Sequence, residues 1–346
     1  MFNNIPEQDF KEILDQTQSE VCDFAGKTVL ILGGSGFLGT MFKYFFLYCN
    51  RELRHSIKII SIDNYVGRTP PIEIQDDNLI HIQHDLSIPL WYKLIDYKCD
   101  FIINASGNAA PSTYERYPVE TLTVSTETIK HLLEFARYNN ARILNFSSSE
   151  VLGTPDAKDI PTNENVRPSV LTMDKRSPYD VAKLFIETIS WVYWQKHGVN
   201  VRVVRPFNVI GYFGRHDFRV ISKFMYAAKD NKPITVYKPA TQTRTFCWYG
   251  DFIAGAIKVL TKSNDFLYHL GKSSEEVDMR TLASLVEKIT NKDNLVKYVD
   301  PPTVYLQEPT RRCPSIEKAR RELNYNPQVT LTDALERIWA WTQSQP

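Results

Sequence analysis

The sequence predicts a doubly wound α/β fold, in which helices cover both faces of a parallel sheet, with a smaller and mostly C-terminal α/β domain beside it. Two observations support this prediction. From Lys27 onward, short apolar runs rich in β-branched residues alternate with longer segments of helical periodicity, and a glycine-rich loop separates the first apolar run from the first helical segment. A chain of 346 residues has the length of one large domain or of two joined ones.

The expected elements follow from these patterns in chain order. Six segments have the length and composition of buried strands: 28–32, 57–62, 80–84, 101–105, 142–147 and 199–205. Four segments have helical periodicity: 37–49, 118–138, 178–197 and 279–290. Ahead of them, residues 7–21 can form an amphipathic helix within an N-terminal extension, residues 1–26. We expect a first domain of residues 27–205, to which residues 246–270 return, and a second domain of residues 206–245 and 271–346.

The composition excludes several classes of function. The chain has 41 Lys and Arg against 40 Asp and Glu, a formal net charge of +1, which is unlike a nucleic-acid-binding protein. No apolar run approaches the roughly 20 residues of a membrane span, and the N-terminus lacks the pattern of a secretory signal. The five cysteines are scattered and have no metal-ligand spacing, which favours a reducing compartment. We therefore expect a cytoplasmic protein without a metal site and without nucleic-acid or membrane partners.

The glycine-rich loop has the spacing of a dinucleotide-binding motif. Gly33, Gly36 and Gly39 follow the first predicted strand and open a helix at Phe37 and Leu38. Glycine allows the backbone to turn tightly and to approach a pyrophosphate, which then meets the positive end of the helix dipole. The strand before the loop and the helix after it distinguish this motif from a simple tight turn.

The acidic residue that such a motif requires follows the second predicted strand. Asp63 lies at about the 20-residue distance at which a carboxylate binds the adenosine ribose. A carboxylate there repels a 2′-phosphate, so NAD is preferred over NADP. Asp85 can accept a hydrogen bond from the adenine amine or cap a helix. The predicted NAD site of this Rossmann domain also includes Phe37, Leu38, Asn64, Leu86 and Ala105.

The residues that indicate catalysis lie further along the chain. Ser149 and Glu150 follow the fifth predicted strand, and Tyr179 and Lys183 lie at the start of the helix after it. Residues four apart share one face of a helix. An ammonium group beside a phenol lowers the pKa of the phenol, so we expect Tyr179 to act as a base near neutral pH.

Four more motifs complete a family resemblance: Ala110-Pro111-x-x-Tyr114-x-x-x-Pro118, Arg205-Pro206-Phe207-Asn208, Gln242-Thr243-Arg244-Thr245-Phe246 and Arg312-Cys313-Pro314-Ser315-Ile316. With them, residues 27–341 resemble the extended short-chain dehydrogenase/reductase family, in its NAD-dependent nucleotide-sugar epimerase/dehydratase branch. The branch members that the chain resembles most are the UDP-glucuronate decarboxylases, or UDP-xylose synthases. They are similar in pairing Ser with Glu, as at Ser149 and Glu150, and in carrying the motif at Arg312.

The resemblance implies a lyase mechanism. Tyr179, assisted by Lys183, removes the proton of the sugar C4 hydroxyl while NAD accepts hydride, and Ser149 holds that hydroxyl. The resulting 4-keto sugar loses CO₂, with Glu150 shaping the carboxylate site and Arg312 protonating C5. The product is a UDP-pentose, or a 4-keto sugar if NADH is not reused.

The same resemblance implies the substrate contacts and the assembly. The predicted UDP-sugar site is formed by Pro111, Tyr114, Asn208, Arg219, Tyr237 and Arg244, and Arg215 is a further candidate for the diphosphate. Relatives form homodimers through the helices that correspond to 118–138 and 178–197, and Trp191, Tyr193 and Trp194 fit a buried face of the second helix.

Two other functions stay open at this point. The chain can be an NDP-hexose 4,6-dehydratase or a 4-epimerase of the same branch. Dehydratases carry Asp-Glu at the Ser149-Glu150 positions, and simple 4-epimerases usually lack the carboxylate of Glu150. A non-catalytic nucleotide-binding regulator is the second alternative. Such proteins typically lose the Tyr or the Lys of the pair, and both are present here.

Overall fold

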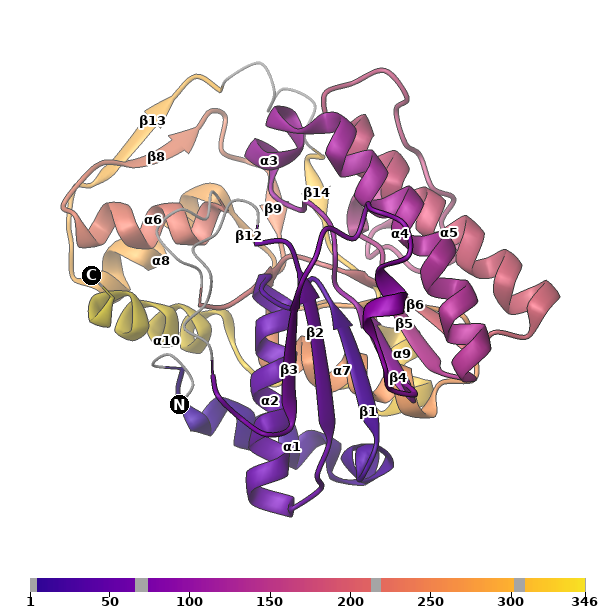
Figure 1. Cartoon of the computed structure of the whole chain (residues 1–346). Coiled ribbons are helices and arrows are strands. Elements are labelled where there is room, and N and C mark those ends of the chain that lie inside the picture. Colours follow the sequence, from indigo (N-terminus) through magenta and orange to yellow (C-terminus); the bar gives the residue numbers. More distant parts are fainter. Residues whose placement is uncertain (1–4, 66–73, 213–218, 302–308, 346) are drawn as a thin grey trace.

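A seven-stranded parallel sheet forms the centre of the computed structural model, which describes residues 5–65, 74–212, 219–301 and 309–345 (Figure 1). Across the sheet the strands are β11 (Leu267–Leu270), β6 (Val201–Pro206), β5 (Arg142–Phe146), β4 (Phe101–Asn104), β1 (Thr28–Leu32), β2 (Lys58–Asp63) and β3 (Leu79–Gln83). The strand order reverses between β1 and β4. In doubly wound sheets, ligands bind at this reversal, in the crevice at the carboxyl ends of the strands.

The prediction of a doubly wound sheet is confirmed. All six predicted strands form, and their ends lie within two residues of the expected ones. The seventh strand, β11, was not expected from the pattern because its four residues, Leu-Tyr-His-Leu, include no β-branched side chain. It pairs in parallel with β6 and extends the sheet by one strand.

Helices cover both faces of the sheet because successive side chains of each strand point to opposite faces. In β1, Val29 and Ile31 pack into one core, together with α1 (Glu7–Val21), α2 (Phe37–Leu53) and α7 (Tyr249–Lys262). Leu30 and Leu32 pack into the other core, together with α4 (Pro118–Asn139) and α5 (Ser177–His197). Figure 1 shows α4 and α5 side by side on their face of the sheet.

The remaining elements form a second lobe and its connections. Its helices and the helices that link it to the sheet are α3 (Pro111–Arg116), α6 (Val220–Lys229), α8 (Met279–Thr290), α9 (Glu317–Leu323) and α10 (Leu331–Ser344). Three small sheets pair β7 (Val209–Ile210) with β10 (Cys247–Trp248), β8 (Ile234–Tyr237) with β13 (Val296–Val299), and β9 (Thr243–Arg244) with both β12 (Val277–Asp278) and β14 (Arg311–Arg312). Four short 3₁₀ helices complete the described chain: η1 (Cys22–Phe24), η2 (Trp91–Leu94), η3 (Ser149–Leu152) and η4 (Ala157–Asp159).

Chain segments from the C-terminal half return to the first sheet. Helix α7 packs on β5 and β6, and β11 pairs with β6. The exact division of the chain into two domains stays a prediction.

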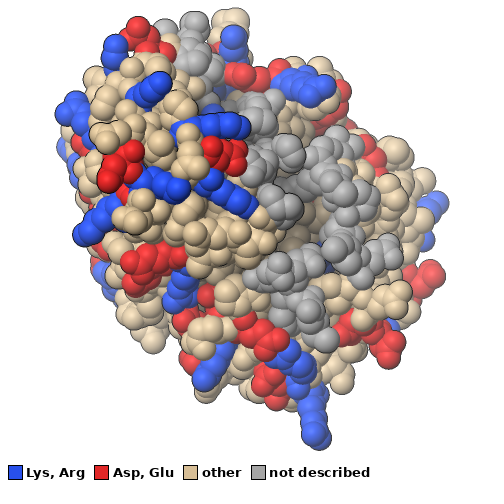
Figure 2. All heavy atoms as spheres, turned by 90° about the vertical axis from the view of Figure 1, so that its left-hand side faces the viewer, with Lys and Arg blue, Asp and Glu red and all other residues tan. Residues whose placement is uncertain are grey.

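On the face in Figure 2, Lys and Arg alternate with Asp and Glu, in keeping with the formal net charge of +1. All five cysteines are free thiols. Within the described ranges, no helix is both long and apolar enough to cross a membrane. The same ranges contain no group of three or more His, Cys, Asp or Glu side chains arranged to hold a metal ion.

A buried ion pair joins α5 to the sheet. The guanidinium of Arg205 on β6 donates two hydrogen bonds of 2.7 Å to the carboxylate of Glu187 on α5. Ser147 donates to the same carboxylate, and Arg205 lies 3.2 Å from the ring nitrogen Nε2 of His269 on β11. This network fixes the helix of Tyr179 and Lys183 against three neighbouring strands.

We predict that Glu187→Ala lowers the free energy of unfolding by about 3–5 kcal/mol, because it leaves the charge of Arg205 buried without a partner. Urea denaturation followed by circular dichroism measures this loss. As a control, Glu127→Ala removes a half-exposed pair with Lys130 and should cost less than about 1 kcal/mol. Equal losses of unfolding free energy in the two variants would show that the buried ion pair stabilises the fold no more than a half-exposed one.

Candidate active site

The glycine-rich loop has the backbone geometry of a phosphate-binding turn. Gly33 has a φ of +73°, and a Cβ atom there would lie 2.8 Å from the backbone of Ala105 at the end of β4. A Cβ atom on Gly39 would lie 2.2 Å from the carbonyl oxygen of Gly33, so α2 can pack on the loop only because this residue is glycine. The first bond within α2 runs from the Thr40 N–H to the Gly36 carbonyl. The amide groups before Thr40 therefore point out of the helix end, where they can bind an anion.

The carboxylate of Asp63 lies directly beside this loop. One oxygen accepts a hydrogen bond of 3.0 Å from the Ser35 N–H, and the other accepts one of 3.0 Å from the Tyr65 N–H. The next strand end adds Asp85, which accepts a hydrogen bond of 3.3 Å from the side chain of Asn64. The two acidic side chains thus follow neighbouring strands, in the positions that suit a ribose and an adenine.

Tyr179 and Lys183 lie on the buried face of α5, both less than a tenth exposed. The ammonium group of Lys183 donates to the carbonyl of Phe146 at 2.9 Å and lies 5.8 Å from the centre of the Tyr179 ring. The Tyr179 ring stacks on Tyr114 of α3, with 5.5 Å between the ring centres. The pair therefore lies at the carboxyl end of β5, beside the crevice at the strand reversal.

The structure pairs Tyr179 with a serine that the sequence analysis did not select. The Ser148 hydroxyl lies close enough to the Tyr179 hydroxyl to lower its pKa, and Ser148 accepts a hydrogen bond of 3.1 Å from the Glu150 N–H. Ser149 is also buried, and its carbonyl accepts a hydrogen bond from Arg312. Three consecutive serines carry no signal in the sequence that tells which of them faces the tyrosine.

The expected lowering of the Tyr179 pKa is wrong for the chain by itself. Burial raises the pKa of Tyr179 to about 12, although the neighbouring Ser148 hydroxyl opposes this shift. Burial also lowers the pKa of Lys183 to about 8. In both cases burial shifts the equilibrium toward the uncharged form, and for Tyr179 the ammonium group of Lys183 does not outweigh this effect.

Glu150 lies between two guanidinium groups. Its carboxylate is in an ion pair with Arg176, which directly precedes α5, and Nη2 of Arg312 on β14 lies 3.2 Å from the same oxygen. Burial would raise the pKa of Glu150, but Arg312 and Arg176 outweigh it and hold the pKa below its ordinary value. Glu150 is therefore a charged group that is only partly exposed to solvent.

The three-stranded sheet of β12, β9 and β14 brings a further cation, Arg244, near Glu150. Arg312 and Arg244 are direct neighbours across the parallel pair β14 and β9, so their side chains leave the sheet on the same face. Arg244 is close enough to Glu150 to lower its pKa as well. Asn208, at the end of β6, donates a hydrogen bond of 2.8 Å to the Thr245 carbonyl and links the first sheet to this segment.

The other predicted site residues lie in several different parts of the fold. Leu86 is buried in the core beside α4, and its carbonyl accepts a hydrogen bond from Thr128. Tyr237 lies on β8 in the second lobe, and Leu38 is half-buried in the first turn of α2. Arg219 lies with its guanidinium carbon 5.7 Å from the centre of the Phe37 ring. Arg215 and the side chain of Pro111 lie outside the described part of the chain.

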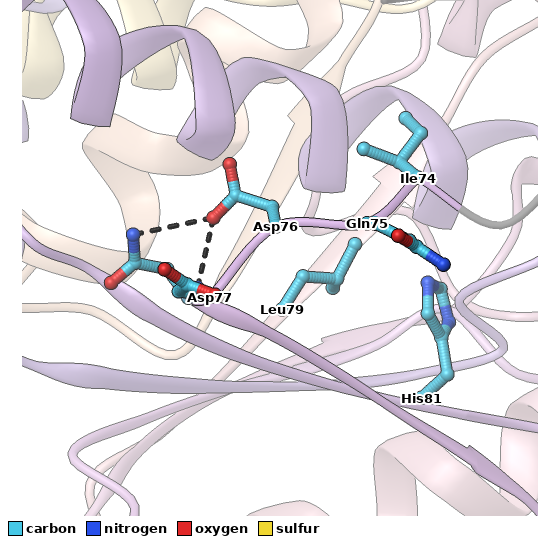
Figure 3. Close-up of a pocket in the computed structure, with 7 residues that line it drawn as sticks. Ile74, Gln75, Asp76, Asp77, Leu79 and His81 are labelled. Atoms are coloured by element: carbon cyan, nitrogen blue, oxygen red, sulfur yellow. Dashed lines mark hydrogen bonds between the residues drawn. The ribbon is translucent and has the colours of Figure 1, made fainter.

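A separate pocket of about 720 Å³ lies beside β3 (Figure 3). It is lined by Ile74, Gln75, Asp76, Asp77, Asn78, Leu79 and His81. Most of these residues precede β3 or begin it, whereas Asp85 follows the other end of this strand. The pocket therefore does not belong to the site at the carboxyl ends of the strands.

A dinucleotide-binding loop and a buried Tyr–Lys pair at one crevice define the class: an NAD-dependent enzyme that acts on a hydroxyl group or a ketone. The chain belongs to the NAD dependent epimerase/dehydratase family, whose model matches residues 29–271. The features of the loop and of Asp63 fit NAD, the cofactor of this family.

Named relatives narrow the comparison. The chain is 30% identical to UDP-glucuronic acid decarboxylase 1 of Danio rerio over 315 residues, 90% of this chain and 71% of that protein. It is 30% identical to UDP-glucuronic acid decarboxylase 6 of Arabidopsis thaliana over 311 residues, 89% and 86% of the two chains. The fold matches that of a dTDP-glucose 4,6-dehydratase from Streptomyces venezuelae, solved with NAD, with a TM-score of 0.79 at 22% identity, covering 91% and 96% of the chains.

We predict that Tyr179→Phe reduces turnover by at least about a hundredfold, the usual contribution of a positioned acid–base group, because only the reacting hydroxyl is lost. NAD binding, measured by isothermal titration calorimetry, should change by less than about twofold, since the ring and Lys183 remain. Tyr193→Phe is the matched control, because Tyr193 lies on the same helix and donates to Glu134. Unchanged turnover in the Tyr179 variant would remove this residue from the mechanism.

Proposed function

We propose that this protein is a UDP-glucuronate decarboxylase that works through a 4-keto intermediate. The observation that carries the proposal is the partly buried Glu150 carboxylate between Arg176 and Arg312, next to the Tyr179–Lys183 pair. Two relatives that are 30% identical to this chain bear the name UDP-glucuronic acid decarboxylase, which supports the same reaction.

The first step is removal of the proton from the C4 hydroxyl of the sugar. Tyr179 accepts this proton, and the hydroxyls of Ser148 and Ser149 hold the oxygen in place. When bound, NAD supplies the hydride acceptor and the positive charge of its oxidised ring, which favours the ionised phenol. The ammonium group of Lys183, held by the Phe146 carbonyl, adds to this effect.

Oxidation at C4 makes the loss of CO₂ possible. The C5 carboxylate is then β to a ketone, so the electrons of the breaking C–C bond move into an enolate at C4. The donors that held the C4 hydroxyl, Tyr179 and Ser148, lie where they can stabilise that oxygen. A proton must afterwards reach C5, and Arg312 is the candidate to deliver it through its contact with the substrate.

Glu150 sets the charge of the carboxylate site. Two guanidinium groups alone would bind the carboxylate of the substrate tightly and would stabilise it against loss of CO₂. With Glu150 ionised between them, the site keeps one net positive charge from Arg176, Arg312 and Glu150. Binding of the uronate is then retained without a strong preference for the ground state over the transition state.

The diphosphate of the substrate requires further cations. Arg244 and Arg219 are the proposed partners of the diphosphate, since bidentate guanidinium contacts suit phosphate oxygens. Asn208, Tyr114, Tyr237 and Pro111 are proposed to line the rest of the site.

A homodimer through α4 and α5 is part of the proposal. Three large apolar side chains of these helices are exposed in the single chain: Val119, Tyr138 and Trp191. Tyr193 and Trp194 of α5 instead have partners within the chain, Glu134 and Phe266. A second copy packed on both helices would cover the exposed residues.

We predict that the protein, given UDP-glucuronate and NAD, releases CO₂ and yields a nucleotide product lighter by that mass. In Glu150→Gln the rate of CO₂ release should fall at least about tenfold while KM changes less, because the charge is lost and the shape is kept. Arg312→Ala should impair the steps after oxidation, so that a 4-keto species or NADH accumulates. Mass spectrometry and NADH absorbance measure these quantities.

Arg311→Ala is the matched control for the Arg312 variant. Arg311 lies next to it on β14 but pairs with Glu276 on the opposite face, so this variant should retain activity. If the protein eliminates water from an NDP-hexose, or inverts C4 without loss of CO₂, the dehydratase or epimerase alternative is correct.

A further inference from the structure

Helix α1 contributes a buried carboxylate to the interior, although it lies outside the residues that match the family model. Asp9 is only 2% exposed. One of its oxygens accepts hydrogen bonds from the hydroxyls of Tyr212, at 2.7 Å, and Tyr249, at 2.9 Å. The other oxygen accepts one of 2.9 Å from Arg337 of α10. A single side chain thus joins the N-terminal helix to three distant parts of the chain.

Both oxygens of the Asp9 carboxylate accept hydrogen bonds in this arrangement. Burial raises the pKa of Asp9, while the two tyrosine hydroxyls and Arg337 oppose the shift. Arg337 also pairs with Glu12 on the next turn of α1, at 2.8 Å. The donors around Asp9 are directed at a charged acceptor, and an amide in its place would turn an N–H group toward some of them.

Both tyrosines are connected to the first turn of α2, the expected site of the cofactor phosphates. Tyr249 contacts this turn directly, and Tyr212 follows Gly211, which packs against it. The Tyr249 ring meets the Phe37 ring edge to face, with 6.1 Å between the ring centres. Gly211, just before Tyr212, packs so closely that a Cβ atom there would lie 2.7 Å from Phe37 and 2.8 Å from Tyr249. Phe37 is the first residue of α2, so the position of its ring and the position of the phosphate-binding amides are coupled.

We propose that Asp9 is a positioning residue for the dinucleotide-binding loop. By holding the hydroxyls of Tyr249 and Tyr212, it fixes these residues against Phe37 and thereby the first turn of α2. The N-terminal helix is then part of the framework of the NAD site, and NAD affinity depends on a residue that does not touch the cofactor. This inference rests on NAD binding and is independent of the reaction proposed above.

The test compares NAD affinity with folding in the full-length chain. We expect Asp9→Asn to raise the Kd for NAD about tenfold in isothermal titration calorimetry, while circular dichroism shows a folded protein. Tyr249→Phe removes only one hydroxyl and keeps the ring on Phe37, so it serves if the first variant does not fold, and it should raise the Kd about threefold or more. In the double variant, the two effects should be clearly less than multiplicative.

Glu12→Gln is the matched control. Glu12 lies on α1 like Asp9 and pairs with the same Arg337, but neither hydroxyl of the two tyrosines bonds to it, so the Kd of this variant for NAD should stay within about twofold of the original value. The proposal is overturned if Asp9→Asn, or Tyr249→Phe where the former does not fold, lowers the thermal stability but leaves the Kd unchanged. It is also overturned if Glu12→Gln raises the Kd as much as Asp9→Asn does.

Discussion

The partly buried carboxylate of Glu150 determines how the two lobes meet. A charge with limited access to water is stabilised by partners of opposite charge, and here these partners come from the segment before α5 and from β14 of the second lobe. The end of β5, the helix of Tyr179 and the small sheet with Arg244 and Arg312 are therefore held around one group. In the proposed reaction, the carboxylate of the sugar binds beside this group.

At the glycine-rich loop, close backbone packing holds the neighbouring elements together. Gly33 and Gly39 leave no room for a side chain, which brings β4, the loop and α2 together at the reversal of the strand order. From the outside, α1 contacts the same turn through Asp9 and Tyr249. Precise position in this part of the molecule comes from contacts between segments that are far apart in the sequence.

The features that could be predicted from the sequence are local or periodic. Strand positions follow from apolar runs, the phosphate-binding loop from glycine spacing, and the pairing of Tyr179 with Lys183 from the helical repeat. The features that could not be predicted depend on tertiary contacts. Glu150 and Arg312 are 162 residues apart, and no pattern in the sequence shows that they form an ion pair. The choice of Ser148 among three serines and the raised pKa of Tyr179 likewise depend on which atoms are buried together.

The most direct test of the central claim is the reaction of UDP-glucuronate with NAD in D₂O, with the nucleotide product analysed by mass spectrometry and NMR. A decarboxylase that protonates C5 after CO₂ has left gives a UDP-pentose, or its 4-keto form, with one deuterium at C5. A product that keeps its carboxylate and carries no deuterium at C5 would contradict the account, because the charges around Glu150 would then serve another reaction.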